Sequence, residues 1–550
     1  MPSGGAGPYR PRMTDRPASE SLPELSGAHV LAQAPSISGA AVGTVDPPDG
    51  HAPAAADPAT ARRPGSAPLT DHPRSDTTGL RHDSLDGLRT RVTGGLITPE
   101  DDGYDDARRV WNADIDRRPA VIVQCASAHD VAAAVTVAAD EGVEIAVRGG
   151  GHSMSGASVV DGGMVIDLGR LNHVVVDPDT RRARVGGGAL LGDLDAATQQ
   201  HGLAVPSGVV SHTGVGGLTL GGGMGWLTRK AGLTIDNLVS AEIVTADGEI
   251  RHVSAQDDPD LFWAIRGGGG NFGVVTQFEF RLIEAGPIVH LGLLFWGLDQ
   301  GREVLRLARE VMATLPPDLN MIIAGLQAPP APFVPEQHQL QPGYALLVTG
   351  FSSGDEHEGL LNRIRGALPP VWEYVTPMPY VALQQMLDEP NAWGFHDYDK
   401  GAYLEELSDA AIDVIVKHLP GKSSPLSVLL LYRLDQAYSE IPDDATAFSG
   451  GRSPRYAVFI VAVCPAPDLL VSDRAWVREL WQALQPYTPH FGLYVNALTD
   501  ADDDRVRSAY GPDKYRRLAR IKAAYDPGNL FHHNSNIKPA QQRAGWQAGQ

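Results

Sequence analysis

The stretch Val147-Arg-Gly-Gly-Gly-His-Ser153 sets three glycines directly before a histidine. Because glycine has no Cβ, the backbone N–H groups from Gly149 to Ser153 can line one concave surface, and such a nest of amides binds phosphate oxygens. His152 then places a nucleophilic or hydrogen-bonding nitrogen beside the bound ligand. Taken alone, the glycine run is more simply explained as a tight turn. The rest of the chain must decide between the two interpretations.

The residues around this stretch predict a β-α-β unit that leads the chain into the glycine run. Residues 120–125 and 144–147 are short apolar runs typical of strands. Between them lies an alanine-rich stretch that Ser127 is placed to cap at the start of a helix.

Two further glycine-rich regions follow, at residues 208–226 and 266–273. The first contains more positions that need backbone freedom or close approach than hairpin turns require. The second matches the dinucleotide-binding fingerprint by letter, from Gly268 to Gly273. However, it precedes a predicted strand over 274–282 instead of opening a helix, and no acidic residue stands about 20 positions later, which argues against a Rossmann fold.

Composition excludes several classes of protein. The chain has 550 residues and a formal net charge of −21, which argues against nucleic acid or an anionic membrane surface as the main partner. Its two cysteines, Cys125 and Cys464, exclude a disulfide framework and a paired-cysteine metal site, and we expect both to be buried. The adjacent His532 and His533 lack a carboxylate cluster, so we expect no metal. We find no apolar run long enough to span a bilayer and no signal peptide, which predicts a cytoplasmic location.

Changes in composition and hydrophobic pattern along the chain predict several segments. Proline, alanine and glycine dominate the first 85 residues, which cannot bury enough apolar surface to fold. Translation starting near Met13 or later would be an alternative explanation of that segment. The expected organisation is a disordered extension over 1–85, an α/β domain over 86–285, an α+β domain with a mostly antiparallel sheet over 286–492, a segment over 493–540 that returns to the site, and a tail over 541–550.

Several long motifs along the chain, taken together and in their sequence order, resemble those of the berberine-bridge-enzyme-like branch of the vanillyl-alcohol-oxidase type of FAD-linked oxidases. The resemblance extends from about residue 88 to 540. It implies an α+β fold, in which a PCMH-type FAD-binding domain of two α/β subdomains joins a substrate domain whose antiparallel sheet is covered by helices. The motifs are Arg148–Ser153, Thr213–Gly217, Leu220–Gly225, Gly232–Leu238, Asp260–Val275, Tyr510–Leu518 and Tyr525–Ile537.

The resemblance implies FAD as cofactor, with the first glycine run on its pyrophosphate. The histidine after that run is bonded to the 8α carbon of the flavin in the family, and His152 matches it. Members with a second bond carry a cysteine where this chain has Val210, so a single covalent linkage is expected. The other predicted cofactor-binding residues are Arg148, Gly149, Gly150, Gly151, Ser153, Gly208, Thr213, Gly214, Gly216, Gly217, Gly222, Gly223, Asp236, Asn237, Gly273, Val274, Asn534 and Asn536.

The catalytic base cannot be transferred from the family. Two tyrosines of plant members are replaced by Ala231 and Ala497, and the acid or glutamine that serves as base in some members aligns near Ser439. Tyr438, Glu440 and Tyr494 are the candidates that remain, and each also has a structural interpretation. His212 either reaches the flavin or substrate or is an ordinary hydrogen-bonded loop histidine.

The predicted function is FAD-dependent oxidation of a small molecule. A base takes a proton from an alcohol (of a carbohydrate or a secondary metabolite) or an amine, hydride passes to the flavin, and O₂ is reduced to H₂O₂. Two alternatives stay open: a dehydrogenase of the same fold that uses a quinone or protein acceptor, and a flavin-binding protein with little catalysis.

Overall fold

A four-stranded sheet carries the first glycine run at its end. Its order is β1 (Gly95–Ile97), β2 (Val121–Gln124), β4 (Met164–Asp167) and β3 (Ile145–Arg148), with β2, β4 and β3 parallel. Helix α3 (Ala128–Glu141) connects β2 to β3 and packs on the sheet, and the Ser127 hydroxyl accepts the Asp130 N–H at 3.1 Å as its N-cap. The predicted β-α-β unit is confirmed.

A five-stranded antiparallel sheet follows. Its strands run in the order β5 (Val174–Asp177), β6 (Arg182–Gly186), β10 (Val274–Arg281), β8 (Leu238–Val244) and β9 (Ile250–Ser254). The third glycine-rich region leads directly into β10, as predicted. The remaining elements of this part are α1 (His82–Arg91), α2 (Tyr104–Ala107), α4 (Leu191–Gln199), β7 (Leu203–Ala204), α5 (Val215–Gly221), α6 (Thr228–Ala231), α7 (Pro259–Ile265) and β11 (Ile283–Glu284).

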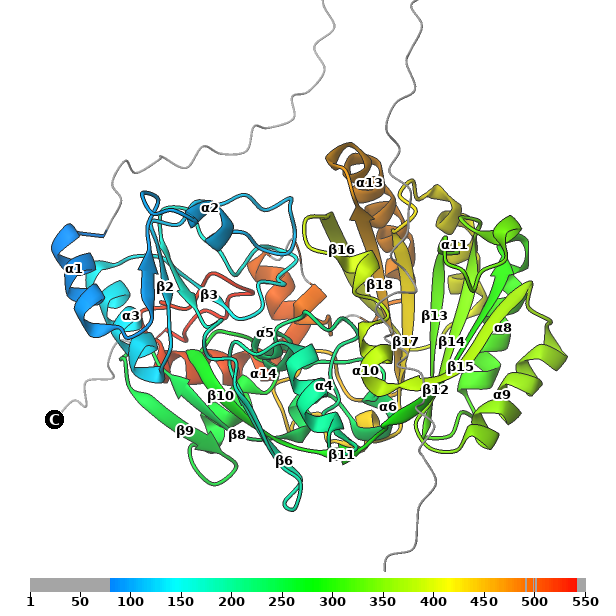
Figure 1. Ribbon diagram of the computed structural model, residues 1–550, viewed down its shortest axis with the longest axis horizontal. Helices are drawn as coiled ribbons and strands as arrows, with labels where there is room; N and C mark the ends of the chain where they lie inside the picture. Colours follow the sequence, from blue (N-terminus) through cyan, green and yellow to red (C-terminus); the bar gives the residue numbers. More distant parts are fainter. Residues whose placement is uncertain (1–79, 490–491, 498, 500–501, 542–550) are drawn as a thin grey trace, which may run out of the picture. The chain divides into compact units, whose positions relative to one another are not determined.

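The third sheet is antiparallel and has seven strands, and helices gather on one of its faces (Figure 1). Its order is β15 (Trp372–Pro379), β12 (Ile288–Gly297), β14 (Pro342–Gly350), β13 (Leu319–Gln327), β17 (Val428–Leu434), β18 (Arg455–Cys464) and β16 (His396–Leu404). The covering helices are α8 (Gly301–Met312), α9 (Gly354–Ala367), α11 (Asp409–His418) and α13 (Pro467–Leu484), while α10 (Tyr380–Gln385) and α12 (Ala437–Glu440) are short.

The two faces of this sheet alternate along each strand, as pleating requires. Leu294 and Ile323 pack under the helices, whereas Phe295 and Ala324 face residues of the glycine-rich loops such as Met224. The sheet therefore shares a core with the first part of the chain.

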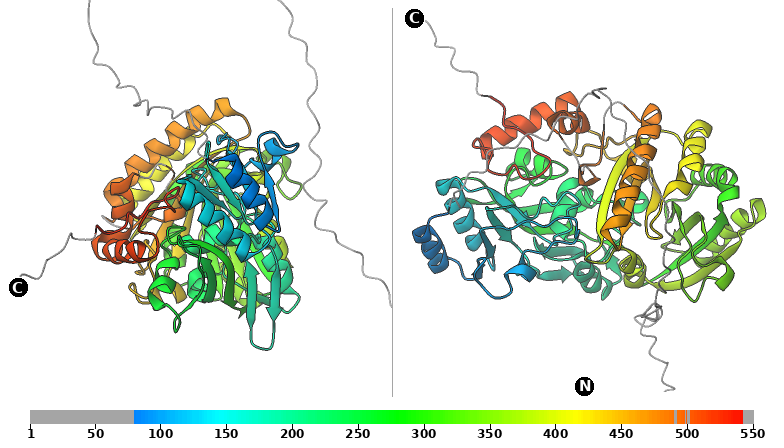
Figure 2. Two further views of the ribbon diagram at one scale, coloured as in Figure 1. Left: turned by 90° about the vertical axis from the view of Figure 1, so that its left-hand side faces the viewer. Right: turned by 90° about the horizontal axis from the view of Figure 1, so that it is seen from above.

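The C-terminal helix α14 (Asp503–Tyr525) lies beside the elements of residues 82–284 in both views of Figure 2. In its last turn, the buried Lys522 ammonium pairs with Asp526 at 2.5 Å and donates to the carbonyls of Asn271 and Phe531 at 2.6 and 2.9 Å. These bonds anchor the segment that follows α14 to the third glycine-rich region.

The structure describes residues 80–489, 492–497, 499 and 502–541. Residues 1–79 of the predicted disordered extension (1–85) lie outside the described residues. Helix α1 begins at His82, so the ordered part of the chain starts before residue 86, where we expected it to start. The predicted tail lies outside them beyond residue 541. The predicted fold class is confirmed, and within the described ranges no helix is long and apolar enough to cross a membrane.

Candidate active site

All three glycine-rich regions and the C-terminal segment line one cavity of about 460 Å³, a volume typical of ligand sites. Most of the predicted cofactor-binding residues line it. They are Gly149, Gly150, Gly151, His152, Ser153, Gly208, Thr213, Gly214, Gly216, Gly217, Gly273, Val274 and Asn534.

The first two glycine-rich regions touch each other through their backbones. A Cβ on Gly150 would lie 2.4 Å from the Gly214 nitrogen, and one on Gly214 would lie 2.3 Å from the Gly150 nitrogen. Gly151 adds a left-handed φ of 68°, which side-chain-bearing residues rarely adopt. Any larger residue at Gly150 or Gly214 would separate the loops, so glycine is required here by close approach.

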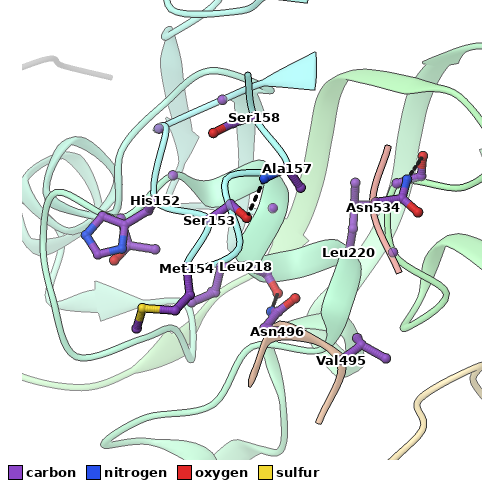
Figure 3. Close-up of a pocket in the computed structure, with 18 of the residues that line it drawn as sticks. His152, Ser153, Met154, Ala157, Ser158, Leu218, Leu220, Val495, Asn496 and Asn534 are labelled. Carbon is purple, nitrogen blue, oxygen red and sulfur yellow. Dashed lines mark hydrogen bonds between the residues drawn. The ribbon is translucent and has the colours of Figure 1, made fainter. Parts of the chain in front are cut away.

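The third glycine-rich region meets the segment that follows α14 at the other side of the cavity. Asn534 donates from Nδ2 to the Gly270 carbonyl at 3.1 Å, while its Oδ1 is buried without a partner. In Figure 3, His152 and Asn534 lie at opposite sides of the view, with Ser153 and Ala157 between them. The Ala157 N–H donates to the Ser153 hydroxyl at 3.0 Å, which closes this loop over the cavity.

His152 is held between two aromatic rings. It stacks on Trp111, with ring centroids 4.1 Å apart and planes inclined by 15°, and its Nε2 lies 3.0 Å from Nδ1 of His212. Burial, and secondly His212, lower the pKa of His152 to about 3. The imidazole is therefore neutral at physiological pH, as a nucleophile must be.

A carboxylate enters the cavity from the third sheet. Asp399 on β16 lines it and accepts a hydrogen bond from the Thr499 hydroxyl. Two residues earlier on the same strand face, Asp397 exchanges two hydrogen bonds of 3.0 Å with Asn112, the neighbour of Trp111. This link ties the start of β16 to the His152 end of the cavity.

The wall beside Asp399 is apolar and aromatic. Leu430 and Tyr432 of β17 and Phe459 and Val461 of β18 line the cavity at alternate strand positions. Tyr432 and Phe459 meet edge to face, with ring centroids 5.5 Å apart. Such a wall favours an apolar or aromatic ligand.

Asp399 and this wall were absent from our sequence-based predictions. Other lining residues that we did not predict include Trp111, Met154, Ser155, Ala157, Ser158, Asn271, Asn391 and His533.

Several predicted cofactor-binding residues do not line the cavity. The Arg148 guanidinium pairs with Asp167 at 2.8 Å and donates to backbone carbonyls, so it holds the end of β3 in place. Asn237 closes its own turn by donating to the Ala231 and Leu233 carbonyls at 2.9 and 3.1 Å. The remaining ones are Gly222, Gly223, Asp236 and Asn536.

Asp236 forms a buried ion pair in place of the predicted cofactor contact. Both of its oxygens meet the Arg452 guanidinium, at 2.7 and 2.8 Å, and the two side chains are 2% and 3% exposed. The bidentate geometry indicates a structural role.

We expect Asp236→Asn to destabilise the protein by about 3–5 kcal/mol, because it leaves a buried guanidinium without its countercharge. The urea midpoint at fixed FAD concentration measures this loss. The exposed pair of Arg516 and Asp513 is the control, since Asp513→Asn should change stability by less than about 1 kcal/mol. A loss of FAD affinity in Asp236→Asn without a shift in the midpoint would restore the cofactor role.

The three predicted candidates for the base lie in different surroundings. Tyr438 is buried outside the cavity lining and donates to the Gly451 carbonyl, and burial raises its pKa far above the usual value. Glu440 is exposed at the end of α12, and Ser439 does not line the cavity either.

Tyr494 is the candidate that does line the cavity. Its hydroxyl accepts the Gly223 N–H at 3.2 Å and the Asn496 amide at 3.0 Å, and burial raises its pKa to about 12. A phenol that is protonated at neutral pH can donate a hydrogen bond but cannot serve as the resting base.

The polar groups of the cavity fit the predicted FAD. Gly150 and Gly214 both line the cavity, and a Cβ on either would collide with the backbone of the facing loop. Asn534, also in the lining, holds a buried Oδ1 without a partner. Val210 lines the cavity where a second cysteine linkage would need sulfur, while Cys125 and Cys464 are buried as free thiols. Among the described residues, no group of three potential ligands is placed to hold a metal ion.

Comparison with known proteins agrees with this geometry. The family model described as "FAD binding domain" matches residues 119–254, and the one described as "Berberine and berberine like" matches residues 493–538. An FAD-linked oxidoreductase of Dictyostelium discoideum is 33% identical over 78% of this chain and 91% of its own length.

A second relative, the (R)-6-hydroxynicotine oxidase of Paenarthrobacter nicotinovorans, is 32% identical over 82% of this chain and 97% of its own length. Among solved structures, the 6-hydroxy-D-nicotine oxidase of Arthrobacter nicotinovorans superposes with a TM-score of 0.71 at 30% identity. That match covers 82% of this chain and 98% of the solved one.

Proposed function

Because the chain belongs to the berberine-bridge-enzyme-like family of FAD-linked oxidoreductases, we propose that it oxidises a small alcohol or amine on a flavin attached to His152. The observation that carries this proposal is that the glycine loops, a neutral histidine and a carboxylate line the same cavity. In this proposal residues 86–285 form the FAD-binding domain, residues 286–492 the substrate domain and residues 493–540 the returning segment.

The glycine loops of this chain hold the pyrophosphate. Bare amides around Gly150 and Gly214 approach the phosphate oxygens without steric hindrance. Asn534, which lines the cavity, offers a buried Oδ1 that can accept a hydrogen bond from the cofactor. His152 fixes the ring system at the other end through one covalent bond, because Val210 stands where a second linkage would need a cysteine. When bound, FAD supplies the acceptor for a hydride from the substrate carbon.

Asp399 is the base that we propose. Its carboxylate accepts the hydroxyl or ammonium proton of the substrate, with the Thr499 hydroxyl holding it in position. Tyr494, protonated at neutral pH, donates a hydrogen bond within the same cavity. This assignment replaces Tyr438 and Glu440, which do not line the cavity.

The apolar wall defines the class of substrate. A sugar needs many polar partners, whereas Leu430, Tyr432 and Phe459 offer an apolar and aromatic surface. We therefore favour an alcohol or amine carried on an apolar or aromatic skeleton over the carbohydrate that the sequence left open.

The test is anaerobic mixing of the purified protein with a panel of apolar amines, aromatic alcohols and oligosaccharides, followed by flavin absorbance. Bleaching by an amine or aromatic alcohol, with H₂O₂ formed when air is admitted, is the expected result. Bleaching without oxygen uptake would identify a dehydrogenase that needs a quinone or protein acceptor. A flavin that no compound bleaches would favour a binding protein with little catalysis.

A further inference from the structure

His212 lies directly behind His152, with 3.0 Å between its Nδ1 and the Nε2 of His152. It does not itself line the cavity, and its own Nε2 is buried without a partner. A substrate role for His212 is therefore excluded by its position, and its contact with His152 is what needs explanation.

Two imidazole nitrogens at this distance share one proton, and the direction of sharing decides which nitrogen of His152 is nucleophilic. If His152 donates from Nε2, its Nδ1 carries the lone pair. If His212 donates from Nδ1, the His152 lone pair at Nε2 points at His212 and away from the cavity. In the first arrangement the nucleophile is Nδ1, the nitrogen that does not face His212.

We propose that His212 is the proton acceptor for covalent flavin attachment, so that His152 bonds to the 8α carbon through Nδ1 while its Nε2 proton passes to His212. This inference rests on the proposed function, since it requires FAD in the cavity.

One N–C bond forms at Nδ1 of His152, the Nε2–H bond breaks with its proton going to His212, and one 8α C–H bond breaks with loss of a proton. The ring takes up the two electrons of that C–H bond and one proton, and so becomes reduced. O₂ then removes the two electrons and, with the proton held by His212 and the one on the ring, leaves as H₂O₂. His212 is again neutral.

The rest of the loop keeps its position without His212. The Ser211 N–H and hydroxyl both donate to Asp388, at 2.7 and 2.5 Å, and the Gly192 and Leu191 N–H groups donate to the Ser211 and Thr213 carbonyls at 2.7 and 2.9 Å. Trp111 independently holds the His152 ring by stacking. A purely structural role of His212 is thus already filled by its neighbours.

The test compares His212→Gln and His212→Ala with the wild-type full chain, each purified from riboflavin-starved cells and incubated with FAD. Glutamine can accept the hydrogen bond from Nε2 but cannot take the proton, so it separates orientation from proton transfer. His201→Gln, at an exposed histidine in the turn after α4, is the matched control. Acid-stable flavin fluorescence of the denatured chain gives the rate of attachment, and retention on a desalting column gives total FAD binding.

We expect both His212 variants to bind FAD and to attach it at least tenfold more slowly than the wild type and the control. Attachment by His212→Gln at the wild-type rate, with or without a slow His212→Ala variant, would overturn the proposal, as would attachment through Nε2 in the wild-type peptide. A wild-type chain that binds no FAD, or binds it without attachment, would instead overturn the proposed function.

Discussion

Substitution of Asp399 by asparagine should lower kcat by about 10²–10⁴-fold while leaving FAD content unchanged. Asparagine keeps the shape of the side chain and its bond to Thr499 but cannot accept the substrate proton. The rate of anaerobic flavin bleaching, measured by stopped flow with any substrate that bleaches the wild type, isolates the chemical step from oxygen reactivity.

Asp397→Asn is the matched control for this experiment. Asp397 stands two residues earlier on β16 but does not line the cavity, and burial and then Asp399 raise its pKa to about 8. Because Asp397 is protonated at neutral pH and does not line the cavity, its replacement by asparagine should change the rate by less than about tenfold. Equal bleaching rates in Asp399→Asn and the wild type would remove Asp399 from the mechanism.

Substitution of Gly150 by alanine should abolish retention of the cofactor. The new Cβ would lie 2.4 Å from the nitrogen and 2.6 Å from the Cα of Gly214, and these backbone atoms cannot rotate away. The two glycine loops must then separate, which removes the amide cradle. We expect FAD per chain to fall at least tenfold after desalting.

Gly366→Ala controls for the general effect of adding a methyl group. Gly366 lies in helix α9, and a Cβ there meets nothing within 4 Å, so alanine should be neutral or slightly stabilising. Full FAD retention by Gly150→Ala, together with an unchanged thermal midpoint, would show that close approach of the two loops is not what forms the site.

The sequence predicted those parts of the site that depend on local backbone chemistry. A glycine run after a short strand is interpretable without tertiary structure, because bare amides and close approach are properties of the residue itself. The strand that ends at Arg148 and the strand that begins at Val274 were also predicted close to their observed positions, because short apolar runs identify them.

Asp399 escaped prediction because β16 does not look like a strand. Its stretch His396-Asp-Tyr-Asp-Lys-Gly401 is polar and lacks an alternating apolar face, yet it lies at the sheet edge with both faces covered. The cavity face of β16 becomes visible only once β18 fixes its register.

Asp236 is the opposite case, because its sequence motif gave no sign of the buried ion pair that the structure shows. It stands in a motif of the family, so it was assigned to the cofactor, but its partner is Arg452, more than 200 residues away in the chain. A conserved-looking motif cannot reveal whether a carboxylate faces a ligand or a distant guanidinium. The apolar wall could not be predicted for a similar reason. Strands β17 and β18 were predicted, but which of their faces lines the cavity depends on how they pair within the whole sheet.

The most direct test of the account is acid precipitation of the purified protein followed by peptide mass spectrometry. We predict a yellow pellet and a single modified peptide that carries one FAD on His152, with no modification at Val210, Cys125 or Cys464. A colourless pellet over a yellow supernatant would contradict the covalent linkage, and a preparation that holds no flavin and takes up none when FAD is supplied would contradict the account as a whole.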